Sequence, residues 1–251
     1  MLLEKAGTTR PILGGFIKSS SPWLVEVLGV LGFDLVIIDT EHGMIGLRDC
    51  EELVRAADAT QILSLIRVAS ADPINILRLA ETGPDGIVVP RVRTAEDVKE
   101  SSDAVRYPPE GARGLGRSRA ANFGAQGALG DYVKAINAKM TVTAIVEDAE
   151  GLAAVDEIAA APGLDMLFTG SVDMSVSLGV PGQLGHPSVL DANKKIVEAG
   201  KKAGKLVGGL AATFEEVTSL LDEGDLDVIC VPTESIVVEH LKQIRALVPS
   251  R

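Results

Sequence analysis

Residues 35–39, LVIID, form a short β-branched run that ends in a carboxylate. Residues 49–58 follow, with apolar positions three and four apart, as in an amphipathic helix. The same alternation of a short apolar run and a longer amphipathic segment recurs along the whole chain. Eight such units in 251 residues predict a (β/α)₈ barrel, with residues 1–251 as a single domain.

The predicted strands are Ile12–Ile17, Leu35–Asp39, Ile62–Val68, Gly86–Pro90, Thr141–Glu147, Met166–Thr169, Leu206–Leu210 and Val228–Pro232. The predicted helices between them include Asp49–Asp58, Pro73–Thr82, Ala95–Val105, Leu152–Ala160, Asn193–Ala203 and Phe214–Glu223. A doubly wound open sheet is the alternative fold. No GxGxxG or GxxxxGK[ST] motif follows the first strand, which argues against that alternative.

Composition excludes several classes of function. The net charge of −11 repels phosphate backbones, so we expect no nucleic-acid partner. No apolar run approaches the roughly 20 residues of a membrane span, and the N-terminus carries no secretory signal, so we expect a cytoplasmic protein without a membrane partner. Cys50 and Cys230 lie far apart, which makes a disulfide framework or a thiolate zinc site improbable.

One connection is unusually long and basic. Residues 106–124 read RYPPEGARGLGRSRAANFG, too rich in Pro, Gly and Arg for an ordinary helix or strand. Coming after the fourth strand–helix unit, this loop is expected at or near the barrel mouth. Anion binding and a subunit-contacting surface both remain open for its arginines, which are Arg106, Arg113, Arg117 and Arg119.

Polar residues follow four of the predicted strands. Active sites of such barrels lie at the carboxyl ends of the strands. The second strand runs into Asp39 and His42, the third ends near Arg67, the fifth ends in Glu147 and the sixth leads to Asp173. We therefore expect these side chains on one rim.

Glu147 and Asp173 follow adjacent strands, and two carboxylates without Cys form a hard oxygen site suited to Mg²⁺ or Mn²⁺. Asp173 has an alternative role as a helix cap. His42 is a candidate proton carrier, or a loop histidine bonded to backbone. Arg67 needs an anionic or carbonyl partner, which a salt bridge to Glu41 or Asp39 would also supply.

The turn that begins at Gly170 presents free backbone N–H groups at a helix start, at Ser171, Val172 and Asp173. Such a turn can hold a small carboxylate. Together these features suggest a metal-bound 2-oxo acid, with its carboxylate on the helix start and Arg67 on its carbonyl oxygen.

Six segments carry a family resemblance: FDLVIIDTEHG, LIRV, GIVVPRVRTAEDV, RYPPEGARGLG, VEDAEGL and MLFTGSVDMSVSLGVPGQLGHP. Through these segments, taken in this order along the chain, the sequence resembles the HpcH/HpaI aldolases. That family includes the aldolases of 4-hydroxy-2-oxoheptanedioate and 2-dehydro-3-deoxyglucarate. The resemblance extends from about Gly14 to Pro232. It implies a (β/α)₈ barrel and a reversible cleavage of a 4-hydroxy-2-oxo acid or 2-keto-3-deoxy sugar acid into pyruvate and an aldehyde.

The resemblance also implies roles for individual residues. Glu147 and Asp173 would bind Mg²⁺, Mn²⁺ or Co²⁺, Arg67 would contact the carbonyl, and His42 would be the base. A carboxylate that assists His42, in some relatives from a neighbouring subunit, would be Glu81. The amides of Val172 and Asp173 would hold the pyruvate carboxylate. An exchanged C-terminal helix and a homo-oligomer, a hexamer built as a trimer of dimers, are implied as well.

The chain departs from the family pattern at two positions. Ile145 stands where many relatives have Gln, and Gly170-Ser171 stands where relatives often have Gly-Pro. Three alternatives remain open: a Schiff-base aldolase, a lyase of citramalyl- or malyl-CoA type, and a non-catalytic barrel that binds 2-oxo acids. The first needs a lysine inside the barrel, but Lys18 follows the first strand and Lys205 precedes the seventh.

Overall fold

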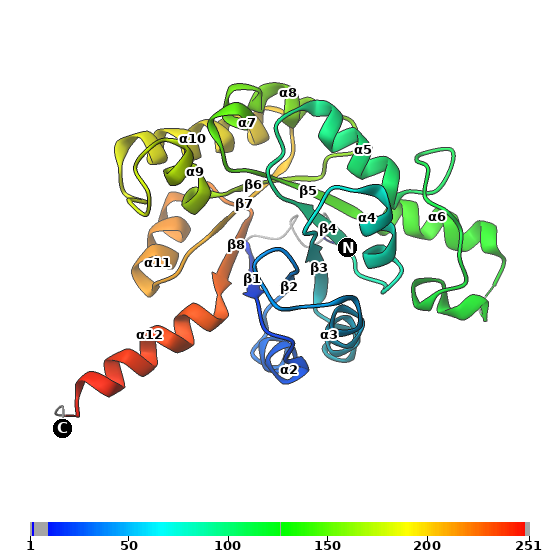
Figure 1. The fold of residues 1–251 in the computed structure, drawn as a ribbon, viewed down its shortest axis with the longest axis horizontal. Coiled ribbons are helices and arrows are strands. Elements are labelled where there is room, and N and C mark those ends of the chain that lie inside the picture. The colour runs from blue at the N-terminus through cyan, green and yellow to red at the C-terminus, as the bar shows by residue number, and fades with distance from the viewer. Residues whose placement is uncertain (1, 3–9, 126, 249–251) are drawn as a thin grey trace.

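A computed structural model describes residues 2, 10–125 and 127–248. In these residues eight parallel strands pair in chain order, and the last pairs with the first to close a barrel (Figure 1). The (β/α)₈ prediction is confirmed. The strands are β1 (Ile12–Ile17), β2 (Leu35–Asp39), β3 (Leu63–Arg67), β4 (Gly86–Val89), β5 (Thr141–Val146), β6 (Met166–Thr169), β7 (Leu206–Leu210) and β8 (Val228–Pro232).

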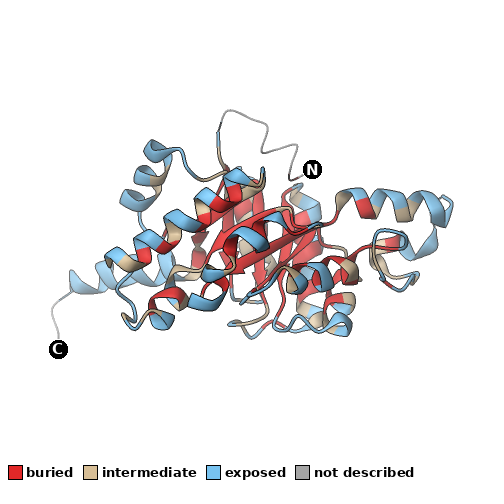
Figure 2. Ribbon diagram, turned by 90° about the horizontal axis from the view of Figure 1, so that it is seen from above, coloured by how far each residue is buried: buried red, intermediate tan, exposed pale blue. Residues whose placement is uncertain are grey.

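The alternation of side chains along each strand produces two apolar cores. Leu35 and Ile37 of β2 belong to the cluster inside the barrel, whereas Val36 and Ile38 pack outward against the helices. Figure 2 shows the buried residues concentrated in the strands and on the inner faces of the helices. Because the period is two, Asp39 continues the inward row of β2 and emerges at the mouth.

The helices are α2 (Pro22–Val30), α3 (Leu47–Thr60), α4 (Pro73–Ala80), α5 (Ala95–Val105), α6 (Leu129–Lys139), α7 (Ala149–Ala153), α8 (Val155–Ala160), α9 (Ser171–Ser177), α10 (Pro187–Lys202), α11 (Phe214–Glu223) and α12 (Thr233–Ala246). The predicted helix starts are confirmed where a side chain caps the N-terminus of the helix. Asp72 accepts from Ile74 and Asn75 N–H at 3.0 and 2.9 Å, and Thr94 accepts from Asp97 N–H at 3.1 Å. The predicted helix at 152–160 is two helices, separated at Ala154.

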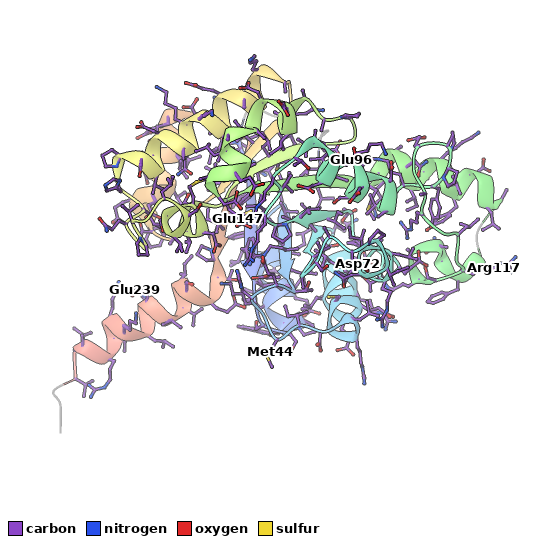
Figure 3. The ribbon with its side chains drawn as sticks, turned by 45° about the horizontal axis from the view of Figure 1, so that its top comes forward. Met44, Asp72, Glu96, Arg117, Glu147 and Glu239 are labelled. Atoms are coloured by element: carbon purple, nitrogen blue, oxygen red, sulfur yellow. The ribbon has the colours of Figure 1, made fainter. Side chains whose placement is uncertain are left out.

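The expected position of the basic loop is wrong. Residues 106–124 follow α5 and precede β5, so they lie at the end of the barrel where the strands begin, opposite the mouth. Arg113 contacts Glu81 at 2.6 Å and Arg119 pairs with Asp58. Figure 3 shows Arg117 near α6, far from Glu147 in the centre of the barrel. The loop does follow the fourth strand–helix unit, as the sequence predicted. Because it comes after the helix of that unit and not after its strand, it lies at the end opposite the mouth.

The last helix, α12, leaves the barrel and extends away from it (Figure 1). Its exposed apolar side chains include Val237, Leu241 and Ile244, which recur at spacings of four and three and therefore share one helix face. Within the described residues, no helix combines the length and apolarity that crossing a membrane requires.

Candidate active site

Strand register gathers the predicted site residues at the mouth. Asp39 of β2 pairs in register with Arg67 of β3, and both continue inward-facing rows. Glu147 directly follows β5 and continues the inward row of Ile145, while Gly170 follows the adjacent strand β6. The barrel thus brings the ends of β2, β3, β5 and β6 to one rim, as the sequence predicted.

Arg67 is held by two carboxylates. Its Nε and one terminal nitrogen donate to the two oxygens of Asp39 at 2.8 and 2.6 Å, and its other terminal nitrogen lies 3.2 Å from Glu41 Oε2. The guanidinium also lies 4.9 Å from the centre of the Phe16 ring. The salt bridge that the sequence left open is therefore present. Since a guanidinium carries five N–H groups, these contacts fix its orientation and leave donors for a ligand.

Asp39 organises the loop after β2. It is fully buried and accepts hydrogen bonds from the backbone N–H groups of Glu41 and His42 at 3.0 and 3.2 Å. Burial alone would raise the pKa of Asp39, but the hydrogen bonds and charge of Arg67 outweigh it and hold that pKa below its ordinary value. Asp39 therefore stays ionised and fixes both the arginine and the His42 backbone.

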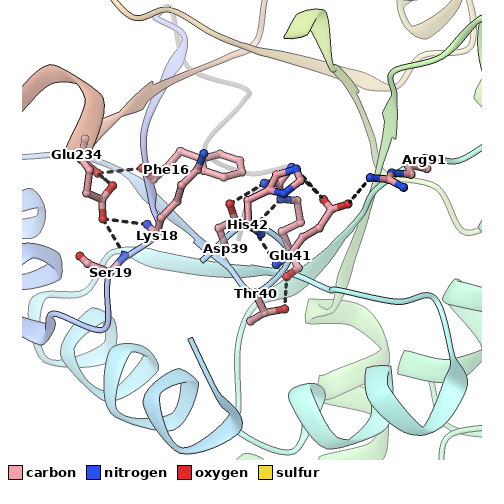
Figure 4. A network of polar contacts seen from close by, with 11 residues as sticks. Phe16, Lys18, Ser19, Asp39, Thr40, Glu41, His42, Arg91 and Glu234 are labelled. Atoms are coloured by element: carbon pink, nitrogen blue, oxygen red, sulfur yellow. Dashed lines mark hydrogen bonds and ion pairs between the residues drawn. The ribbon is translucent and has the colours of Figure 1, made fainter. Parts of the chain in front are cut away.

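Glu41 links three basic side chains across the rim (Figure 4). Its carboxylate lies 3.2 Å from Arg67, 3.6 Å from Arg91 and 3.8 Å from His42 Nε2. Oε2 is buried and accepts no hydrogen bond from the described residues. The His42 side chain is 43% exposed, so its ring can meet a ligand that enters the mouth.

Glu147 is the buried carboxylate of the rim. It is 3% exposed, and Oε1 accepts the backbone N–H of Arg91 at 2.8 Å. Arg91 itself has a left-handed backbone conformation, with φ of 53°. Burial, with smaller contributions from the charges of Asp173 and Glu41, raises the pKa of Glu147 to about 7.

Asp173 lies in the first turn of α9, next to Glu147. Within the described residues it makes no hydrogen bond or ion pair, so the structure gives no sign of the capping role. The first N–H of α9 bonded to the backbone is that of Met174, which donates to Gly170 at 2.9 Å. The amides of Val172 and Asp173 precede it, as expected for the free start of a helix. The Ser171 hydroxyl accepts from Asn193 at 3.0 Å.

The donor set fits a hard divalent cation. The described residues contain no group of three or more His, Cys, Asp and Glu arranged for a metal. Glu147 and Asp173 instead supply two carboxylates without a cationic partner of their own, and Glu147 Oε2 faces Gly170, where a Cβ would approach it to 2.8 Å. Two oxygen ligands leave coordination positions for water and substrate.

Glu81 does not join these residues within one chain. It follows α4 and lies at the end of the barrel where the strands begin. Its carboxylate pairs with Arg113, whose side chain is fully buried and stacks 4.8 Å from the Tyr107 ring. The carboxylate near His42 in the same chain is Glu41.

The sequence indicated Glu41 only as one alternative partner of Arg67, and it did not single out Arg91. Glu41 stands in the quoted TEHG segment, directly before the candidate base, so its position was a usable signal. Arg91 follows Pro90 at the end of a strand, but its left-handed backbone has no sequence signature, since glycine is the residue that usually adopts it.

The fold and site define a barrel enzyme whose mouth combines an acidic pair, a fixed arginine and an accessible histidine. The model of the HpcH/HpaI aldolase/citrate lyase family matches residues 13–229. The chain belongs to this family, and the resemblance read from the sequence is confirmed.

Two enzymes and one solved structure illustrate the similarity. A 2-dehydro-3,6-dideoxy-6-sulfogluconate aldolase of Pseudomonas putida is 34% identical over 213 residues, which cover 84% of this chain and 82% of that enzyme. A 5-keto-4-deoxy-D-glucarate aldolase of Shigella boydii is 32% identical over 212 residues, with the same coverage of both chains. The crystal structure of an HpcH/HpaI aldolase/citrate lyase family protein from Burkholderia cenocepacia superposes with a TM-score of 0.91 at 30% identity, covering 99% of this chain and 98% of that one.

Proposed function

We propose that this protein is a divalent-metal-dependent pyruvate aldolase that cleaves a 2-keto-3-deoxy sugar acid, or another 4-hydroxy-2-oxo acid, into pyruvate and an aldehyde. The observation that carries the proposal is the pair of carboxylates, Glu147 and Asp173, unpaired beside Arg67 and His42. The two aldolases named above act on keto-deoxy acids, which supports this reaction over a CoA-thioester lyase or a silent barrel.

Glu147 and Asp173 would hold Mg²⁺, Mn²⁺ or Co²⁺. When bound there, the cation acts as a Lewis acid toward the 2-oxo group of the substrate. Burial of Glu147 near the like charges of Asp173 and Glu41 favours a neutralising cation, since an uncompensated buried carboxylate is costly.

Arg67 would stabilise the negative charge that develops on the 2-oxo oxygen during cleavage. Because Asp39 and Glu41 fix the guanidinium beforehand, its remaining N–H groups need no reorganisation when the charge appears. The free N–H groups of Val172 and Asp173 would hold the pyruvate carboxylate, with Ser171 positioned by Asn193.

His42 would remove the proton of the C4 hydroxyl. The C3–C4 bond then breaks, its electron pair stays with the pyruvate half, and the C4 carbon leaves as an aldehyde. Glu41, 3.8 Å from His42 Nε2, stabilises the protonated ring within the same chain. Glu81 would reach His42 only from a neighbouring subunit, because its own chain holds it at the opposite end.

A homo-oligomer accompanies this proposal. A second copy that exchanged its C-terminal helix would cover the exposed apolar stripe of α12. It would also cover the pocket between α11 and α12, which is lined by Phe214, Val217 and Ile236. Such an exchange, in a hexamer built as a trimer of dimers, agrees with the family resemblance.

The test is pyruvate release from a panel of 2-keto-3-deoxy sugar acids and 4-hydroxy-2-oxo acids, with Mg²⁺, Mn²⁺ or Co²⁺ added to metal-free protein. We expect release that depends on the cation and that is lost in E147Q. Full activity in excess EDTA would refute the metal assignment. A covalent pyruvate adduct trapped by borohydride would favour the Schiff-base alternative.

A further inference from the structure

Lys18 is a cation of the mouth that the proposed reaction does not use. It follows β1, where Gly14 and Phe16 face the interior, so Lys18 continues the inward row. Ile17 pairs in register with Ile38, which sets Lys18 beside Asp39 on the next strand. Figure 4 shows its side chain extending beside Phe16.

The ammonium of Lys18 has no acidic partner among the described residues. Among the described residues no carboxylate lies within 4.0 Å of it. Glu234 is the acid in contact with this segment, but it accepts the backbone N–H groups of Lys18 and Ser19 at 2.9 and 2.8 Å. In an acidic protein, a charge left unpaired on the rim is available to an anionic ligand.

The order of the strands places Lys18 at the far end of a bound substrate. In a closed barrel of eight strands, β1 lies opposite β5, the strand that leads to Glu147. The pyruvate half would lie near β5 and β6 and the C4 hydroxyl near His42, after β2. The aldehyde half therefore continues toward β1.

Another cation of the mouth, Arg91, lies on the pyruvate side. Its N–H bonds to Glu147, and its guanidinium lies 3.6 Å from Glu41. Figure 4 shows Lys18 and Arg91 on opposite sides of His42 and Glu41. Of these two side chains, Lys18 is the one placed for a group beyond C4.

We propose that Lys18 binds an anionic group, a carboxylate or a sulfonate, at the end of the aldehyde half, and thereby selects charged aldehydes over neutral ones. This inference rests on the proposed aldolase function. A flexible ammonium on four methylene groups suits such a contact, because it can follow anions at different distances from C4. The basic loop at residues 106–124, at the opposite end of the same chain, cannot serve this purpose within one chain.

Binding without turnover gives the first test. The ligands are 2-oxo diacids of five to seven carbons, each compared with the monocarboxylic 2-oxo acid of equal carbon number; all lack the C4 hydroxyl. By calorimetry in the presence of Mn²⁺, we expect wild type to prefer the diacid by about 10- to 100-fold at the best length, the range of a charge-assisted hydrogen bond. K18M should lose that preference and bind the monoacid unchanged, and K18R should keep most of it.

The control is K194M, the same substitution on the exposed face of α10, where the lysine is 75% exposed. Condensation of pyruvate with succinic semialdehyde or with butanal gives a second readout. We expect the K18M substitution to lower kcat/KM for the charged aldehyde and to leave kcat/KM for the neutral aldehyde unchanged. The K18M protein should still exchange the methyl protons of pyruvate with solvent at the wild-type rate.

Equal weakening of diacid and monoacid binding in K18M, or a diacid preference that survives in it, would overturn the role of Lys18 while leaving the aldolase proposal intact. Wild-type protein that neither exchanges pyruvate protons nor condenses pyruvate with any divalent cation would overturn the proposed function, and this inference with it.

Discussion

Gly170 approaches Glu147 so closely that a Cβ on residue 170 would lie 2.2 Å from the Cβ of Glu147 and 2.8 Å from Oε2. Rotating the end of the Glu147 side chain can relieve the contact with Oε2 but not the contact with the Cβ, which is fixed to the backbone directly after β5. The glycine therefore lets the start of α9, with Asp173, lie against the Glu147 carboxylate.

G170A is expected to displace Glu147 and weaken Mn²⁺ binding by tenfold or more, because a ligand moved by about 1 Å no longer completes the site. Calorimetric titration of the metal-free protein with Mn²⁺ measures the change in metal affinity. G185A is the matched control, since nothing lies within 4 Å of a Cβ there. Equal metal affinity in G170A and wild type would contradict the assigned site.

The pKa of Glu147, raised to about 7 by its burial, predicts a pH-dependent site. Metal binding requires the ionised carboxylate, so Mn²⁺ affinity should fall about tenfold per pH unit below pH 7 and level off above it. Calorimetry in buffers of different ionisation enthalpy would detect release of about one proton at pH 6 and little at pH 8.

The same shift has a consequence for the stability of metal-free protein. The folded-state pKa lies above the value of about 4.3 for an unfolded glutamate, so the folded protein holds this proton more tightly. The contribution of Glu147 to stability should therefore decrease as pH rises from about 4.3 to about 7. E147Q should remove that decrease in urea unfolding series, and an unchanged pH dependence in E147Q would be inconsistent with it.

D39A should be strongly destabilising. It removes the partner of a buried guanidinium and the acceptor of two backbone N–H groups, at a cost of about 3–5 kcal/mol. Urea unfolding measures the loss. D72A, which deletes an exposed helix cap, is the comparison and should cost about 1 kcal/mol. Similar losses in the two variants would argue against Asp39 as the anchor of Arg67.

Glu81 can assist His42 only across a subunit boundary, which mixed assemblies can test. H42A and E81Q should each be impaired in activity, and co-assembled subunits should regain part of it, because some sites then combine His42 of one chain with Glu81 of another. Activity of the mixture is compared with the sum of the separate variants. If the mixture is no more active than the sum of the separate variants, Glu81 does not assist His42, and its role is limited to the contact with Arg113.

The apolar stripe of α12 should mediate assembly. V237D combined with L241D places two charges on that face and is expected to reduce the oligomer to a smaller species in light scattering after size exclusion. K242D changes a residue outside the stripe and should leave the assembly intact. An unaltered mass for V237D/L241D would exclude the helix from the interface.

Much of the barrel was predictable because its signals are local. Five of the eight predicted strands have the observed bounds, among them Ile12–Ile17 and Val228–Pro232. Capped helices, such as those at Pro73 and Ala95, also begin where predicted. The short helix α9 was predicted only as a helix start after Gly170, because seven residues carry too little periodicity to define both ends.

The sequence by itself determined the eight strand–helix units and placed Asp39, Arg67 and Glu147 at strand ends, since side-chain alternation and helical spacing are written in neighbouring residues. Only the tertiary structure decided that Glu41 also reaches Arg91 and His42, and that no carboxylate of the described residues pairs with Lys18. It also decided that Glu81 and the arginines of residues 106–124 lie at the other end. Those relationships depend on how the barrel closes, on strand register and on which end of each helix a loop follows. Such contacts join residues that no local pattern connects.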